Sequence, residues 1–296
     1  MASLRQIRGR IKSIQNSKQI MRAMQLVSGS KLKRSQTKLV QAREVLGFLD
    51  GLRDRVLAAA PELTHPLCQP VQPDEGEEPP PETLVIFTSD TGLCGSYNAN
   101  LIHLAESRLR GDGGAKPMDV VFIGKKGYRY FTKRGRIAIE SYLDLAGRPN
   151  LARAEEIGRA LMQRFLDGRT RSVSFLYSRF ISAMTYRPTV QQWLPVQIEA
   201  AANDTQRAAS PEEYIFEPSA ERVFADLLPR WAMATFQLVM LEAFTSEHSA
   251  RMIAMKNATD NAQELLNSLT NQRNRVRQAS ITKELSEIVG TVEALK

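Results

Sequence analysis

Cysteine and long apolar runs are scarce in this sequence, and each shortage excludes a class of protein. The 296 residues hold only two cysteines, Cys68 and Cys94, too few for a disulfide-stapled domain or a multi-cysteine zinc site. No stretch approaches 18 consecutive apolar residues, so no segment is expected to cross a membrane as a helix. The N-terminus lacks the apolar core of a secretory signal. With 43% apolar and 24% charged residues, the composition is that of a folded globular chain.

Proline is absent from both ends of the chain. All 14 prolines lie between Pro61 and Pro229. Since proline costs about 3 kcal/mol in a helix interior, each end can form one long helix. Most of the glycines, 12 of 17, fall between Gly76 and Gly168 in the middle of the chain. The predicted domains are an N-terminal coiled-coil helix (1–60), an acidic, proline-rich connector (61–82), an α/β globular domain (83–218) and a C-terminal coiled-coil helix (219–296).

Both ends carry apolar residues at alternating intervals of three and four, as in a coiled coil. The N-terminal set is Leu4, Ile7, Ile11, Ile14, Lys18, Met21, Met24, Val27, Leu32, Leu39, Leu46 and Leu49. The C-terminal set is Leu238, Leu241, Thr245, His248, Met252, Met255, Thr259, Ala262, Leu266 and Leu269, and it resumes after a slip near 273–277 as Ile281, Leu285, Ile288, Val292 and Leu295. The two ends are therefore predicted to pair as an antiparallel coiled coil, about 90 Å long for about 60 residues.

Charge is as uneven as proline. The first 43 residues hold 11 Lys or Arg and no acid, whereas residues 62–82 hold six acids and no Lys or Arg. The basic end fits a nucleic-acid arm, a helix on a membrane surface or a face that docks on an acidic protein. Aromatic side chains are absent from the basic segment, so stacking on bases is unavailable to it.

The middle of the chain alternates strand-like and helix-like segments, which favours a largely parallel, Rossmann-like sheet with right-handed crossovers. The predicted strands are 83–88, 119–123, a short one at 137–139, 172–177 and 190–198. The predicted helices are 97–110 and 151–166.

The loop Gly92-Leu93-Cys94-Gly95 follows a strand and opens a helix, a position where α/β folds hold nucleophiles and phosphates. Its spacing matches no dinucleotide, P-loop or nucleophile-elbow motif. A catalytic cysteine also needs a base, and the chain has only three histidines. A tight turn around a small buried cysteine is the preferred interpretation, and a Cys94-dependent enzyme is the alternative.

Two further features have a plain structural interpretation. The basic run 125–129 is interpreted as a solvated turn in preference to a phosphate loop. Met252 and Met255, beside Arg251 and Lys256, form a stripe that is more often packing than a binding site. No histidine pair has ligand spacing and the acids do not cluster with cysteine, so no metal site is expected.

Three motifs resemble the gamma subunit of the F-type ATP synthase, and together they extend over essentially the whole chain. The first is the N-terminal helix 7–33, and the second is the loop at 88–98. The third comprises Ser246-Glu247-His248-Ser249-Ala250-Arg251-Met252 and its continuation to Ile288. Thr91 departs from the arginine that is usual in the family's loop, and the connector 62–82 is not a family signature. The resemblance assigns a structural role to the loop residues Ser89, Asp90, Gly92, Leu93, Cys94 and Gly95.

The resemblance implies a rotor shaft without a catalytic site or bound nucleotide of its own. In that family the helix pair turns inside a ring of three alpha and three beta subunits, which bind Mg-ATP and ADP. The α/β domain meets the epsilon subunit and the c-subunit ring, and a delta subunit completes the partners. Proton or other ion flow turns the shaft, which changes nucleotide affinity at the beta sites and regulates ATPase activity. The absence of a leader in the sequence suggests a peripheral protein on the cytoplasmic face of a bacterial inner membrane.

The resemblance also implies contact residues. Alpha and beta contacts are expected at Lys12, Lys18, Arg22, Met24, Arg251, Met252, Lys256, Arg277, Gln278, Thr282 and Glu284. An apolar bearing is expected at the tip, at Ile281, Leu285, Ile288, Val292 and Leu295. Epsilon and c-ring contacts are expected at Lys31, Lys33, Arg34, Tyr214, Ile215, Phe216 and Glu217. Met24 is expected near Gln278 and Thr282 across the helix pair. A basic coiled coil that binds nucleic acid, with salt-dependent affinity, is the alternative function.

Overall fold

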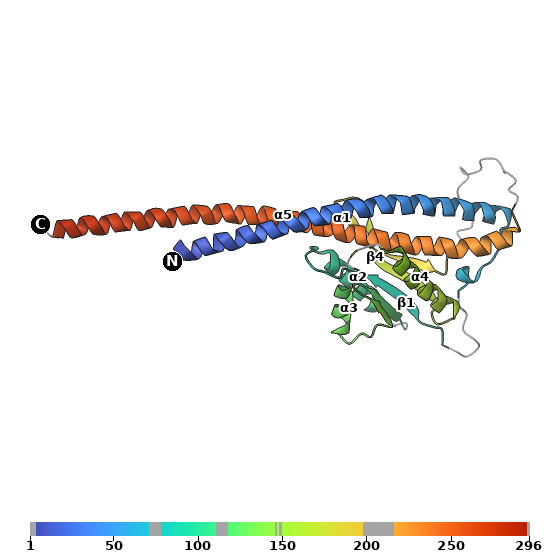
Figure 1. The fold of residues 1–296 in the computed structure, drawn as a ribbon. Helices are drawn as coiled ribbons and strands as arrows, with labels where there is room; N and C mark the ends of the chain where they lie inside the picture. The colour runs from blue at the N-terminus through green and yellow to red at the C-terminus, as the bar shows by residue number, and fades with distance from the viewer. Residues whose placement is uncertain are drawn as a thin grey trace. The chain divides into compact units, whose positions relative to one another are not determined.

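A computed structural model describes residues 4–70, 78–110, 118–145, 147, 150–197 and 216–294. The chain divides into two compact units. The first unit holds residues 1–29 and 251–296, and the second holds residues 30–250. Two long helices contribute to both units: α1 runs over Leu4–Ala59 and α5 over Ala220–Ala294 (Figure 1).

In the first unit the two helices pack against each other in antiparallel fashion. Ile7, Ile11, Leu266 and Leu269 form a small buried cluster, to which Ile14 and Val276 add partly buried contacts. The C-terminal spacing of three and four also gives Met255, Thr259 and Ala262 buried positions. The predicted coiled coil is confirmed here, because the residues that recur at this spacing are those that lose solvent contact.

One predicted position in the N-terminal stripe is wrong. Val27 is exposed, and the neighbouring Ser28 is buried instead. Gly29 lies against Met252, whose sulfur would be 3.5 Å from a β-carbon added to that glycine. The missing side chain at Gly29 therefore leaves room for the bulky methionine, which apolar periodicity alone does not reveal.

The second unit is built on a five-stranded sheet in the order β3-β2-β1-β4-β5. The strands are β1 (Glu82–Phe87), β2 (Met118–Ile123), β3 (Glu140–Tyr142), β4 (Ser172–Phe180) and β5 (Tyr186–Leu194). The first four are parallel, whereas β5 pairs antiparallel with β4. The predicted α/β class and the largely parallel sheet are confirmed, with the β4–β5 hairpin as the exception.

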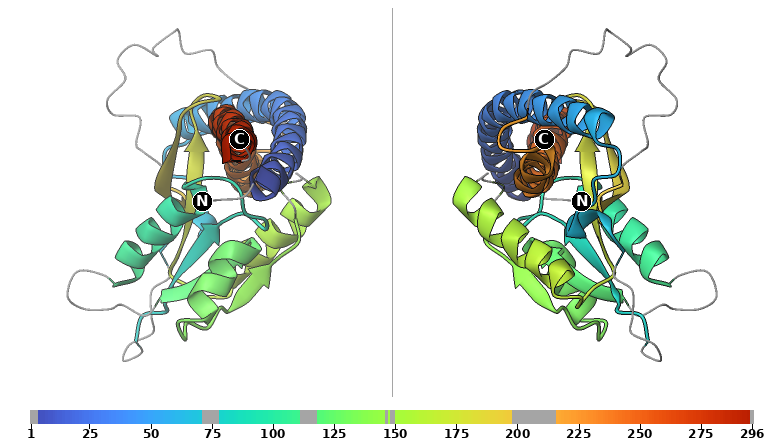
Figure 2. Two further views of the ribbon diagram at one scale, coloured as in Figure 1. Left: turned by 90° about the vertical axis from the view of Figure 1, so that its left-hand side faces the viewer. Right: turned by 90° about the vertical axis from the view of Figure 1, so that its right-hand side faces the viewer.

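Helices cover both faces of this sheet. The helices α2 (Tyr97–Arg110) and α3 (Lys125–Thr132) pack on one face, through Leu101, Ala105 and Phe131. The other face is covered by α4 (Leu151–Leu166), by the N-terminal part of α5 and by the short 3₁₀ helix η1 (Pro66–Cys68). Figure 2 shows α2 and α4 on opposite sides of the strands. Because both faces of the sheet are covered, β1 and β2 are almost continuously apolar.

Three sequence predictions in the middle of the chain need correction. The third strand is 140–142 and not 137–139, and Ile137 is largely exposed. The basic run from Lys125 opens helix α3 and is not a solvated turn. The last strand is 186–194 and not 190–198, because it turns directly from β4 and ends before Pro195. Residue 198 lies outside the described residues.

The N-terminal end of α5 extends through a proline. The helix begins at Ala220 and contains Pro229 in its interior, which removes one backbone donor. Phe224 and Leu228, which both precede that proline, are fully buried in the core of the α/β unit. Apolar burial of this kind offsets the local cost, at about 25 cal/mol per Å² of apolar surface.

Candidate functional site

The helix pair of the first unit has a defined register. The Lys18 Nζ donates a hydrogen bond to Gln263 Oε1, and Gly29 lies against Met252. In both pairs the two residue numbers add up to 281. By the same register Leu4, the first residue of α1, lies opposite about residue 277 of α5. Beyond that point α1 has no residue that could pair with α5. The final stretch of α5 therefore continues without α1 beside it.

This register corrects one expectation. Met24 lies opposite residues near 257, about 21 positions from Gln278. At 1.5 Å per residue that is about 30 Å, so Met24 is not near Gln278 or Thr282.

The unpaired end of α5 presents an apolar stripe to solvent. Ile281, Leu285, Ile288 and Val289 are 49%, 58%, 61% and 60% exposed. Polar neighbours on this stretch support the helix locally, as in the Lys283–Glu287 ion pair at the i, i+4 spacing. Four large apolar residues at helical spacing, left in water, are typical of a surface that another protein covers. The side chain of Val292 and the whole of Leu295 lie outside the described residues.

The charged residues expected at partner contacts differ in exposure. Lys12, Arg22, Lys256, Arg277 and Glu284 are exposed, and Lys18 is half-buried through its bond to Gln263. Arg251 is only 8% exposed, which leaves its guanidinium little surface for another subunit. Met24 and Met252 are half-buried, while Gln278 and Thr282 are exposed. The first unit thus carries a basic surface on α1 without a single acid before Glu44.

The residues expected to contact epsilon and the c ring also differ in exposure. Lys33 and Arg34 are exposed on α1, and Lys31 is half-buried. Phe216 packs partly against the core of the α/β unit, while Glu217 is exposed. Tyr214 and Ile215 lie outside the described residues.

The loop after β1 is a hydrogen-bonded turn around a buried cysteine, as the sequence predicts. Leu93 and Gly95 have φ values of +63° and +57°, and Cys94 is 2% exposed. The Asn98 Nδ2 donates to Cys94 Sγ at 3.1 Å and to Ser89 Oγ at 2.7 Å. Ser89 is completely buried and donates to the Thr91 carbonyl oxygen at 2.6 Å. The side chains of Ser89, Cys94 and Asn98 are thereby used in holding the loop together.

Asp90 fastens this loop to the neighbouring helix. Its Oδ1 accepts hydrogen bonds from Lys125 N at 3.0 Å and from Asp144 N at 3.2 Å. Lys125 is the first residue of α3, whose preceding residue, Gly124, supplies no side-chain cap. The carboxylate of Asp90 therefore occupies the helix N-terminus, a position that favours an anion.

Replacing Asp90 by alanine is expected to lower the free energy of unfolding by about 1–2 kcal/mol, because two backbone donors lose their acceptor. Asp90→Asn keeps an acceptor oxygen and is expected to cost less than about 1 kcal/mol. Urea unfolding followed by tryptophan fluorescence measures both. Equal midpoints for Asp90→Ala and the unmodified chain would mean that water satisfies these donors equally well.

An open cleft of about 520 Å³ adjoins the loop and is lined by Cys94, His103 and Lys126, among others. Its lining contains a cysteine, Cys94, and a histidine, His103, the nucleophile and the base that a cysteine enzyme needs. The hydrogen-bond partners of the Cys94 sulfur are nevertheless Asn98 and Ser89, neither of which is a base. This arrangement favours the structural interpretation of Cys94 over the catalytic one.

Both thiols are expected to react slowly in the folded chain. Burial raises the pKa of the Cys68 thiol to about 11, against an ordinary value of 9.0, and Cys94 is inaccessible. At pH 8 the Cys68 thiolate is then about a hundredfold less populated than in an unfolded chain, and the thiolate is the reactive form. Ellman's reagent should label both residues rapidly only in denaturant. Fast labelling of Cys94 in the native chain would revive the enzymatic alternative.

The ligand position of a doubly wound sheet is occupied by α5 itself. Such sheets bind ligands outside the carboxyl ends of their strands, where the strand order reverses. Here Tyr97 Oη, just after the β1 loop, donates to the Ala243 carbonyl oxygen at 3.0 Å. Ser246 Oγ donates to the carbonyl oxygen of Ser178, near the end of β4, at 2.8 Å. The same chain thus fills the crevice that a nucleotide would take.

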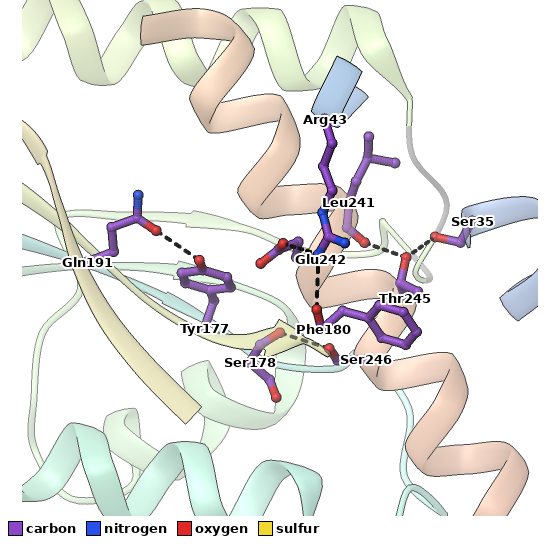
Figure 3. Close-up of polar contacts among 10 residues, drawn as sticks. All are labelled: Ser35, Arg43, Tyr177, Ser178, Phe180, Gln191, Leu241, Glu242, Thr245 and Ser246. Carbon is purple, nitrogen blue, oxygen red and sulfur yellow. Dashed lines mark hydrogen bonds and ion pairs between the residues drawn. The ribbon is translucent and has the colours of Figure 1, made fainter. Parts of the chain in front are cut away.

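A buried polar network surrounds this part of α5, and sequence reasoning missed most of it. Arg43 Nη2 donates to Glu242 Oε1 at 2.7 Å and to the Phe180 carbonyl oxygen at 3.0 Å (Figure 3). Tyr177 Oη donates to Gln191 Oε1 at 2.8 Å. Burial and, after it, the Glu242 carboxylate raise the pKa of Tyr177, so its hydroxyl stays neutral. The sequence offered one sign of this network: Thr245 and His248 occupy positions of the apolar stripe. Polar side chains at such buried positions require hydrogen-bond partners.

Within the described ranges, no helix is long and apolar enough to cross a membrane. Among the same residues, no group of three or more His, Cys, Asp or Glu side chains could hold a metal ion.

The fold defines a class of protein that combines a pair of long antiparallel helices, formed by the two ends of the chain, with an α/β unit formed by its middle. Residues 3–295 match the family model described as ATP synthase. The chain is 39% identical to the ATP synthase gamma chain of Moorella thermoacetica and 40% identical to that of Desulforamulus reducens, over 100% of both chains in each case. The chain belongs to the ATP synthase gamma chain family.

Solved structures agree on the fold. The chain resembles a chain of the Euglena gracilis mitochondrial ATP synthase structure of OSCP, F1 and c-ring, with a TM-score of 0.65, 18% identity and coverage of 99% and 94% of the two chains. It also resembles a chain of the Tetrahymena thermophila central stalk and c-ring structure, with a TM-score of 0.56, 20% identity and coverage of 81% and 99%. As a gamma chain of the F-type ATP synthase, the protein is a non-catalytic subunit, the rotor of the central stalk.

Proposed function

We propose that this chain couples rotation of a membrane c-subunit ring to nucleotide affinity changes at the beta subunits. Three alpha and three beta subunits surround the helix pair and carry the Mg-ATP and ADP. Epsilon and the c ring meet the α/β unit, and delta completes the complex. Protons or other ions drive the ring at the cytoplasmic face of a bacterial inner membrane, and this chain is held there through the complex.

The observation that carries this proposal is the exposed stripe at 281–289 on the unpaired end of α5. A member of the family with four large apolar residues in water at a helix end needs a partner of matching chemistry there. An apolar sleeve formed by the alpha and beta subunits supplies it. A non-directional apolar contact also suits a bearing, since it has no single preferred angle.

The charged surface of α1 supports a second type of contact. Lys12 and Arg22 on α1 and Lys256 on α5 are exposed cations of the first unit. These cations suit contacts with acidic segments of the beta subunits. Further alpha and beta contacts are proposed nearer the C-terminal end of α5, at Arg277, Gln278, Thr282 and Glu284. Exposed ion pairs contribute about 0–1 kcal/mol each, so they steer the partner and let the shaft turn. Arg251 contributes less, because it is buried.

Contacts at the foot are proposed at Lys33, Arg34 and Glu217, which are exposed. Lys31 and Phe216 are partly buried and would contribute through their remaining surface. Tyr214 and Ile215 complete the set expected from the sequence.

Co-assembly tests the proposal. The purified chain is mixed with the alpha and beta subunits of its own source, and the mass by gel filtration and the rate of Mg-ATP hydrolysis are measured together. One copy of the chain joining six large subunits, with cooperative hydrolysis, is the expected result. A chain that stays apart from correctly folded partners would overturn the proposal. Salt-dependent binding to DNA in that case would favour the nucleic-acid alternative.

A further inference from the structure

One segment of α5 is buried on every side although it carries many polar side chains. All residues from Leu241 to Arg251 are buried, and they include Glu242, Thr245 and His248. Apolar packing is non-directional and lets surfaces slide, whereas hydrogen bonds require a fixed angle between donor and acceptor. The polar side chains of this segment therefore restrain the helix in a way that leucines would not.

Two of these contacts go to α1. Ser35 Oγ lies 2.6 Å from Thr245 Oγ1, and the Thr245 hydroxyl donates to the Leu241 carbonyl oxygen at 2.6 Å. Because Thr245 has one proton and uses it on Leu241, Ser35 is the donor between the helices. The second contact is the ion pair of Arg43 with Glu242 (Figure 3).

Three further contacts go to other elements of the α/β unit. Ser246 donates to the carbonyl oxygen of Ser178 on β4, at 2.8 Å. Ser249 donates to the Ala183 carbonyl oxygen in the turn between β4 and β5. His248 Nε2 is 2.8 Å from the Gly147 carbonyl oxygen, in the segment between β3 and α4.

The five side chains point in different directions. At about 100° per residue, positions 242, 245, 246, 248 and 249 spread over roughly 160° of the helix circumference. A rotation of α5 about its own axis would therefore break several hydrogen bonds at once. Arg43 is distinctive because its guanidinium joins three elements: α1, α5 and β4.

We propose that these contacts form a torsional lock, defined as Ser35, Arg43, Glu242, Thr245, Ser246, His248 and Ser249, which fixes the rotational position of α5 against α1 and the sheet. Arg43 is its main positioning residue. The inference rests on the proposed function, in which the α/β unit is turned at the foot while the helix end works against a load. A helix that slipped around its own axis within the domain would dissipate that work, because the broken hydrogen bonds would not return it. The lock is expected to matter under load and to matter little without it.

The lock is tested with the variant Arg43→Met/Glu242→Gln in the assembled, membrane-reconstituted complex. Methionine keeps the apolar stem of Arg43 and removes both hydrogen bonds, while glutamine avoids a buried unpaired charge. ATP hydrolysis without an ion gradient is expected to stay within about twofold of the unmodified complex, because the unloaded shaft needs little torsional stiffness. The largest ion gradient that ATP hydrolysis can sustain is expected to fall by about twofold or more, since the directional restraints are gone.

A covalent bridge provides the rescue. Ser35→Cys and Thr245→Cys, added to that variant, place two sulfurs where the hydroxyls are 2.6 Å apart. Oxidation, verified by peptide mapping against Cys68 and Cys94, is expected to restore the normal gradient, and reduction is expected to lower it again to the level of Arg43→Met/Glu242→Gln. Lys38→Met removes an exposed cation from the same helix and is the matched control, expected to sustain the normal gradient.

The outcomes separate the two proposals. If the unmodified chain does not assemble or stimulate hydrolysis, the proposed function is wrong. If it does, and Arg43→Met/Glu242→Gln sustains the normal gradient or the oxidised bridge does not restore it, the torsional lock is wrong. If that double variant fails to assemble, Ser35→Ala is measured instead, because it removes one hydrogen bond without leaving a buried charge unpaired. A complex with Ser35→Ala that sustains the normal gradient would then overturn the lock.

Discussion

Replacing Gly124 by alanine is expected to destabilise the α/β unit by about 3–5 kcal/mol, a large part of the 5–15 kcal/mol typical of a domain. Gly124 has a φ of +105°, which side chains rarely adopt. A β-carbon added there would lie 2.7 Å from the Thr88 carbonyl carbon and closer still to its oxygen. These are backbone atoms at the end of β1, so no side chain can rotate away to make room.

Gly135 is the matched control for this substitution. It also has a positive φ, of +79°, but a β-carbon there would meet nothing within 4 Å. Gly135→Ala is therefore expected to cost only the conformational strain, about 1–2 kcal/mol. Urea unfolding followed by tryptophan fluorescence measures both variants, because Trp193 is 2% exposed in this unit and Trp231 lies in it too. Equal costs for Gly124→Ala and Gly135→Ala would show that the chain at Thr88 shifts freely.

Replacing Ile281, Leu285 and Ile288 together by glutamine is expected to leave the isolated chain as stable as before, to within about 0.5 kcal/mol. These side chains are 49–61% exposed, and glutamine is a good helix former. In the assembled complex the same change is expected to weaken binding of the helix end by about 3 kcal/mol, or about a hundredfold, at roughly 1 kcal/mol for each half-exposed apolar side chain that the partner would bury.

The measurement pairs thermal unfolding of the isolated chain with a titration of the chain into the alpha and beta subunits, read by ATP hydrolysis. Ser286→Gln changes an exposed polar residue on the same stretch and is expected to alter neither readout. If the triple glutamine variant assembles with unchanged affinity, the stripe at 281–289 is not a bearing. If it unfolds the isolated chain, the stripe is packed within the chain itself.

The helical ends of the chain and helix 151–166 were the most predictable parts of this molecule. Apolar residues at intervals of three and four can be read directly from the sequence, and in a helix such residues all lie on one face. That face is buried in the structure, as shown by Ile7, Ile11, Leu266 and Leu269. Helix 151–166 was predicted with the bounds that α4 has, because Asn150 caps its start and apolar residues line one side. Local physics decides these features, so a single sequence contains them.

Register and neighbours were less predictable. The apolar repeat shows which face of each helix is buried. Because the pattern looks nearly the same after a shift by one or more heptads, it does not show which residues of the two helices lie opposite each other. It therefore did not exclude a register that places Met24 beside Gln278. The register depends on individual contacts, such as Gly29 with Met252 and Lys18 with Gln263. Helix α3 was mistaken for a turn because its start is stabilised by Asp90, which lies 35 residues earlier in the chain.

The sequence by itself determined the class of this protein: two proline-free helical ends, an α/β middle, a basic first helix and an apolar tail, together with the motifs of the gamma family. Only the tertiary structure decided that β5 is antiparallel, that α5 fills the crevice of its own sheet, and that Arg43, Glu242 and Ser35 meet around it. The physical reason is that periodicity and propensity act over a few residues, whereas a buried hydrogen bond between positions about 200 residues apart exists only once the chain has folded.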